Sequence, residues 1–175
     1  FECLQNIEVV RGAGALQYGT QFGGLINFNI QKPHPDKKID IVSRYTQGSF
    51  GLSTNFTSIS GTKNKSSYYA FYNYKKGDGF RSNSNFNSSN FYLYFSHNSS
   101  DKMSFSFELT FLDYLAQQAG GLTDEMFQEN ILQSNRERNW FNVNWLLYNL
   151  KLSYFLSEAT NLSISTFFLD AHRYA

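Results

Sequence analysis

The chain has 175 residues, a formal net charge of +1, 18% aromatic residues and only 17% charged residues. Typical globular chains carry about 25% charged residues, so aromatic side chains are unusually frequent here relative to charges. No apolar run approaches the roughly 20 residues of a membrane-spanning helix, which excludes a helical membrane protein. The near-neutral charge gives no basic surface for nucleic acid, and a single cysteine, Cys3, excludes a disulfide within the chain.

Residues 1–35 differ in composition from the rest of the chain. Two strand-like runs, Ile7–Val10 and Leu25–Ile30, flank a glycine-rich segment, and Pro33 and Pro35 follow the second run. The glycine spacing matches neither the dinucleotide fingerprint nor the Walker phosphate loop. We therefore expect one domain over residues 1–35 and a second over residues 36–175. The start of the chain lacks a basic and apolar leader, so we expect it to begin within a longer protein.

From residue 36 onward, large apolar and polar side chains alternate with the period of a β-strand. The clearest case is Met103–Phe111, in which every odd position is large and apolar. We assign Phe50, Leu52 and Phe56 to the same pattern. The alternation predicts seven strands, at roughly 39–47, 50–60, 67–76, 90–98, 103–113, 139–156 and 162–174.

Two of these strands have ambiguous faces. Within 67–76, Tyr68, Ala70 and Tyr72 or the opposite set, Tyr69 and Phe71, could face outward. In 139–156, the apolar phase changes after Leu147, which predicts a bulge near Tyr148 and Asn149.

The connections alternate between short polar turns and longer loops, and this pattern favours one fold class. Residues 61–66, 98–102 and 157–161 form short turns, whereas 77–89 and 114–138 are long. Strands of about ten residues with this alternation are typical of an antiparallel transmembrane β-barrel, with apolar side chains outward and polar ones inward. The alternative is a soluble β-sandwich, which shows the same period. Its core, however, is richer in Val and Ile than in Phe and Tyr, so we favour the barrel.

The segment Ile7–Gly19, followed by Gly23–Phe28, resembles the end of the plug domain of TonB-dependent outer-membrane receptors. Gly77–Arg81 is similar to the family's second extracellular loop. Gly120–Thr123 and Gln133–Arg136 are similar to the third loop of its ferric dicitrate branch.

The resemblance implies a plug remnant over residues 1–35, followed by about seven N-terminal strands of a barrel of about 22 strands. It also implies the bacterial outer membrane, contact with its lipid, uptake of a ferric chelate and energy from a TonB-type inner-membrane complex. The ferric chelate is cargo, and no resident cofactor or metal is implied. The alternative is a passive porin or adhesin barrel without energised transport.

The expected ligand site lies between the plug apex, at Gln17 and Tyr18, and the extracellular loops. The loops contribute Arg81, Gln117, Gln118, Arg136 and Arg138. Guanidinium groups bind carboxylate or hydroxamate oxygens through paired hydrogen bonds. The competing interpretation is that loop acids pair with these arginines: Asp78 with Arg81, and Asp124, Glu125, Glu129 and Glu137 with the other two.

The ligand identity stays open. Gln17 occupies a position that looks basic in the ferric dicitrate branch, and a neutral amide cannot neutralise a carboxylate. A neutral or hydroxamate siderophore is therefore the alternative to ferric citrate. His34, His97 and His172 are scattered without metal-ligand or nucleophile spacing, so we do not expect an enzyme.

Overall fold

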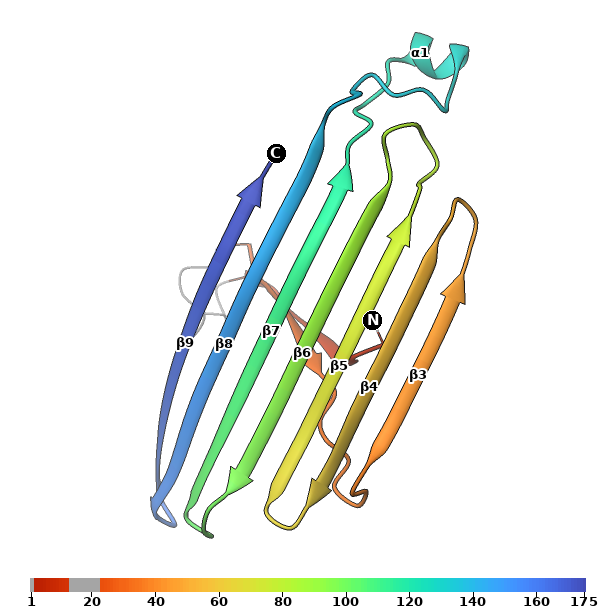
Figure 1. The fold of residues 1–175 in the computed structure, drawn as a ribbon. Helices are drawn as coiled ribbons and strands as arrows, with labels where there is room; N and C mark the ends of the chain where they lie inside the picture. The colour runs from red at the N-terminus through yellow and green to blue at the C-terminus, as the bar shows by residue number, and fades with distance from the viewer. Residues whose placement is uncertain (1, 13–22) are drawn as a thin grey trace. The chain divides into compact units, whose positions relative to one another are not determined.

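The structure is a computed structural model that describes residues 2–12 and 23–175 (Figure 1). The chain divides after Pro33 into two compact units, which are described separately below. No helix within the described residues is long and apolar enough to cross a membrane.

The first unit contains an antiparallel pair of strands. Strand β1 (Leu4–Val10) pairs with β2 (Leu25–Ile30), with Ile7 opposite Phe28. The pairing continues at one end through a 2.8 Å hydrogen bond from the Gln31 amide to the Cys3 carbonyl. That this unit is the end of a plug domain stays a prediction.

The second unit is a seven-stranded antiparallel sheet in which each strand neighbours the next in sequence (Figure 1). The fold class expected from the alternation, an antiparallel sheet of seven strands after residue 36, is therefore confirmed. The strands are β3 (Asp40–Gln47), β4 (Ser53–Lys63), β5 (Ser66–Gly77), β6 (Phe86–Asn98), β7 (Met103–Gln117), β8 (Trp140–Ser157) and β9 (Thr160–Tyr174), with one short helix, α1 (Asp124–Glu129), between β7 and β8.

The two ends of this sheet differ in their connections. Residues 64–65, 99–102 and 158–159 form short turns at one end, and residues 48–52, 78–85 and 118–139 connect the strands at the other. Consecutive hairpins of an antiparallel sheet must alternate between its ends. All the longer connections therefore meet at the same end of the sheet, as Figure 1 shows at its top.

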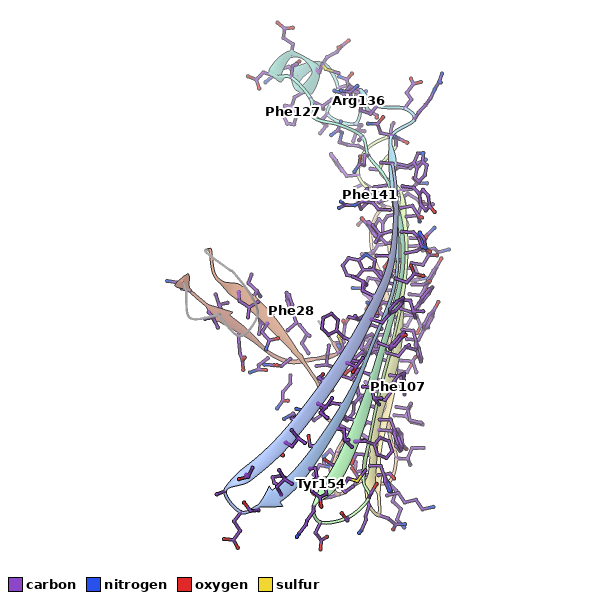
Figure 2. All side chains as sticks on the ribbon, turned by 90° about the vertical axis from the view of Figure 1, so that its left-hand side faces the viewer. Phe28, Phe107, Phe127, Arg136, Phe141 and Tyr154 are labelled. Carbon is purple, nitrogen blue, oxygen red and sulfur yellow. The ribbon has the colours of Figure 1, made fainter. Side chains whose placement is uncertain are left out.

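The strand register separates two chemically different faces. Phe95, Phe107 and Leu150 are directly opposite one another across β6, β7 and β8, while Tyr94, Glu108 and Asn149 form the adjacent row. Directly opposite residues of an antiparallel pair point to the same face. Phe91, Leu93 and Phe95 of β6 thus share a face with the apolar residues of β7. The sheet is curved, and Figure 2 views it edge-on with Phe107 on the convex side and Phe141 on the concave side.

The expected bulge near Tyr148 and Asn149 is wrong. Strand β8 pairs with β7 in unbroken register from Trp140 to Tyr154, and the only irregularity recorded for its pairing with β9 lies between Phe155 and Ser157. Both alternating sets of β8 are apolar in its centre, so hydrophobicity alone could not fix the phase. Phe141, Val143, Trp145 and Leu147 all lie on the concave face, in register with Ala116, Tyr114, Leu112 and Thr110.

Strand β4 also begins later than expected. Phe50 and Leu52 belong to the connection before Ser53, not to a strand, and Phe56 shares the concave face, not the apolar convex one. The reason is an aromatic cluster on the concave face, made of Phe56, Phe71, Tyr92 and Tyr69, with 5.5 Å between the ring centroids of Phe71 and Tyr92. Its members are only 2–7% exposed. This cluster also settles the orientation of β5, with Tyr69 and Phe71 facing the concave side.

Candidate functional site

The three longer connections form a joined group, which we call the loop cluster (residues 48–52, 78–85 and 118–139). The first two are linked by a 2.8 Å hydrogen bond from the Asp78 amide to the Phe50 carbonyl. The rings of Phe50 and Phe80 meet edge to face, with 5.5 Å between centroids. This geometry is the favoured one for aromatic pairs and holds the first loop against the second.

Arg81 joins the second loop to the third. Its Nε and Nη2 atoms donate to the Gln133 carbonyl at 2.9 and 2.8 Å. Its Nη1 donates to the Gly120 carbonyl at 2.8 Å, and Nη2 also lies 3.5 Å from the Ala119 carbonyl. A guanidinium has five N–H donors in a planar fork, and here most of them bind backbone carbonyls. No ion pair joins Arg81 to Asp78 among the described residues.

Asn83 makes a second connection to the third loop. Its Nδ2 lies 3.2 Å from the carbonyls of both Gln118 and Asn139, and it also donates to the Arg136 carbonyl. Asn83 adopts φ of 53°, a left-handed conformation that asparagine tolerates better than most residues. The Ser82 amide adds a 3.0 Å hydrogen bond to the Leu132 carbonyl. The second and third loops therefore behave as one structural unit.

The third loop is also ordered by its own side chains. Thr123 caps α1 through a 3.2 Å hydrogen bond from the Met126 amide to its Oγ1, with Asp124 and Glu125 in the first turn. Ser134 Oγ bridges the carbonyls of Ala119 and Arg136 at 3.1 and 2.9 Å. These bonds fix the return of the chain toward β8.

Arg136 and Arg138 lie on this return segment with exposed side chains. Within the described residues neither guanidinium makes a hydrogen bond or ion pair, and the acids of the third loop form no ion pair with them. Figure 2 shows Arg136 and Phe127 on a loop that bends over the concave side of the sheet. Arg136, which has no ion-pair partner among the described residues, thus overhangs the concave face.

Beside its aromatic and apolar residues, the concave face below the loops carries polar and charged groups. The Arg173 guanidinium stacks 5.0 Å from the centre of the Phe141 ring. Glu108 accepts a hydrogen bond from Tyr92 and lies within electrostatic reach of Lys151. Such a face, lined by hydroxyls, amides and charges, can solvate a polar ligand in a way that an apolar sheet face cannot.

The structure brings only some of the predicted site residues together. Gln17 and Tyr18 lie outside the described residues. Arg81 donates to carbonyls of the third loop, and the Gln118 carbonyl accepts a hydrogen bond from Asn83. Gln117 follows Leu115 on the convex face, away from the two arginines. Ligand contact by any of these residues, and by Arg136 and Arg138, stays a prediction.

Sequence reasoning missed the role of Asn83. It follows Arg81 by two residues in a polar segment, Gly77–Asn85, whose composition predicted only a loop. Asparagine in such a segment signals a left-handed turn position, but the three carbonyls that Asn83 binds carry no sequence signature. No group of three metal-ligating side chains occurs within the described part of the chain.

No protein-family model and no curated protein matches the sequence. A crystal structure of the ferric citrate transporter FecA in the unliganded form matches the fold, with a TM-score of 0.81 over 95% of this chain and 24% identity. This chain has the fold of a β-barrel wall. It spans 26% of the length of that transporter chain, and the likeness concerns the fold alone.

Proposed function

We propose that the protein takes up a ferric chelate across the bacterial outer membrane, using energy relayed by a TonB-type inner-membrane complex. The observation that carries this proposal is the loop cluster: it is fixed internally, and it carries Arg136 and Arg138, which are unpaired among the described residues. Arg136 lies over the concave face, where aromatic and polar side chains alternate with charged ones. Arginine forks bind the carboxylate or hydroxamate oxygens that surround iron in such chelates.

The apolar convex face of the sheet supports the proposed position in the membrane. On β7 the convex face is apolar from Met103 to Phe111 and becomes polar at Asp113. A band of nine residues matches the about 9–11 residues that a tilted transmembrane strand needs. The loop cluster then extends beyond the membrane on the outer side. The fold of a ferric citrate transporter and the plug-like residues 7–28 further support a transporter rather than a passive porin or an adhesin.

The ligand class is a ferric chelate with oxygen donors at its surface. Gln17 is neutral, and the apolar side chain of Phe127 is 55% exposed. Both features suit a hydroxamate siderophore, which is therefore the alternative cargo to ferric citrate. The iron enters as part of the chelate, and the protein's contacts are expected with the ligand oxygens.

Uptake of radiolabelled iron by cells that produce the intact protein tests the function. We expect ferric citrate or ferric hydroxamate uptake that stops when the inner-membrane energy-coupling complex is deleted. Uptake that continues unchanged after that deletion would identify a passive channel instead.

The site is tested by the double variant Arg136→Ala, Arg138→Ala in the intact protein. Losing two charge-assisted contacts should weaken ferric chelate binding at least about tenfold by calorimetric titration. The matched control is Lys65→Ala, Lys102→Ala, which removes two cations at the short-turn end of the sheet. Unchanged affinity in the arginine variant would remove these residues from the ligand site.

A further inference from the structure

The convex face carries a hollow that the proposed transport does not use. Its volume is about 410 Å³, and it lies where β5, β6 and β7 meet the loop cluster. Six side chains that share the convex face line most of it: Tyr74, Lys76, Asp78, Asn87, Leu115 and Gln117. The size falls within the range of small-molecule sites, about 300–1,000 Å³.

The register places this hollow directly above the apolar band of the convex face. Tyr74, Ser89 and Asp113 are opposite one another and form the first polar row, while Lys76, Asn87 and Leu115 form the next row outward. The row below the first contains Phe91 and Phe111. With the band in the bilayer, the hollow stands at the level of the headgroups of the outer leaflet.

The charges of the hollow argue against an anionic ligand. Lys76 supplies one cation and Asp78 one carboxylate, so the two charges cancel, whereas phosphate sites depend on an excess of cations. The Asp78 carboxylate lies close against Gly51 at the wall, so that a Cβ on Gly51 would collide with its Oδ2. Gly51 also has φ of +66°, so this wall requires glycine.

The remaining lining groups suit a neutral ligand rich in hydroxyls. Asn85, Asn87 and Gln117 each offer amide donors and an acceptor, and Tyr74 offers a flat ring with a hydroxyl. Within the described residues none of these four side chains makes a hydrogen bond, although other polar groups of the convex face pair with one another. Tyr72 with Ser89 and Ser43 with Thr57 are examples, both at 3.2 Å. The amides of the hollow are therefore available to a ligand.

We propose that this hollow binds the saccharide part of a glycolipid of the outer leaflet, with the acyl chains lying against the apolar band below it. The proposal rests on the membrane placement given above. A free sugar would gain nothing from Phe91, Leu93, Leu109 and Phe111, whereas the chains of a glycolipid would bury that surface.

The test uses the intact protein reconstituted in a bilayer of zwitterionic phospholipid. Dodecyl maltoside is the probe, below its critical micelle concentration, and bound copies are counted by native mass spectrometry. Dodecylphosphocholine, with the same chain and no sugar, and free maltose are the comparison ligands. We expect dodecyl maltoside to bind at least about tenfold more tightly than either. Equal binding of dodecylphosphocholine would overturn sugar recognition, and equal binding of maltose would overturn the glycolipid.

The variant Asn87→Leu should lower the affinity for dodecyl maltoside about tenfold while leaving dodecylphosphocholine binding unchanged. Gln47→Leu is the matched control, because Gln47 lies on the same face as Asn87, separated from it by two strands, and outside the hollow. Equal loss in both variants would overturn the site. The readout is glycoside binding and not iron uptake, so the transport proposal can fail without this one failing, and the reverse.

Discussion

At the scale of single residues, Arg81 is the most constrained side chain of the loop cluster, because its fork binds the carbonyls of Gly120 and Gln133 together. Arg81→Lys keeps the charge but cannot reproduce the fork. We expect it to lower the opening free energy of residues 118–139 by about 2 kcal/mol, which is about a 30-fold faster hydrogen exchange. Hydrogen–deuterium exchange with mass spectrometry measures this directly.

Arg138→Ala is the control for that experiment, since its guanidinium makes no hydrogen bond within the described residues. Exchange that is equally fast in the Arg81 and Arg138 variants would show that the fork of Arg81 does not specifically order the third loop.

Gly120 allows a second test at the same scale. It has φ of +75°, and a Cβ there would lie 2.0 Å from Asn135 Oδ1, whereas a Cβ on Gly121 would meet nothing within 4 Å. Gly120→Ala should destabilise the third loop by about 1–2 kcal/mol. Gly121→Ala should have little effect. Limited proteolysis of the loop compares the two, and similar cleavage rates would contradict the assigned backbone geometry.

The sequence predicted the contacts of some of these loop residues but not of others. The cap at Thr123 was predictable because capping depends on neighbours along the chain. The contacts of Arg81 and Asn83 were not, because their partners are backbone carbonyls 35–56 residues away in sequence and any residue type supplies a carbonyl.

At the scale of the strands, substitutions on the two faces of β7 should differ in their effect on stability. Phe107→Arg places a charge in the middle of the apolar convex band and should cost about 2–4 kcal/mol of unfolding free energy in a bilayer. Ser106→Asn, on the concave face opposite Ser96, should cost well under 1 kcal/mol. Denaturant unfolding of the reconstituted protein gives both values. Equal costs would mean that the convex band does not face lipid.

The positions of the strands were predictable from the sequence. Which side chains of a strand point to which face was not always predictable. Met103–Phe111 has one apolar set and one polar set, so period and face follow from sequence alone. In β8 both sets are apolar around Leu147, and in β5 both are aromatic. Only cross-strand pairing, such as Phe71 with Tyr92, selects the face. The error at Phe56 has the same origin, because an aromatic residue can be buried on either side of a sheet.

At the scale of the whole molecule, the sheet has two free edges among the described strands. Strand β3 pairs only with β4, and β9 pairs only with β8. Unpaired backbone groups in a bilayer cost several kcal/mol each, and exposed edges associate with other chains. We expect the 175-residue chain, produced alone in detergent, to form aggregates by light scattering. A stable monomer would show that both edges tolerate exposure.

The class of fold was predictable from alternation and loop lengths, while the joined loop cluster and the hollow on the convex face were not. Both depend on which residues three successive hairpins bring to one end of the sheet.

The hydrogen bonds of Arg81 and Asn83 that join the second and third loops have a consequence for how the sequence can change during evolution. Arg81 and Asn83 recognise main-chain oxygens of residues 118–139 and no side chain there. Most substitutions in the third loop therefore leave the anchoring intact, and its exposed side chains are free to vary. Under the proposed transport function, divergence toward a new cargo can then proceed on a scaffold of unchanged shape, one surface residue at a time.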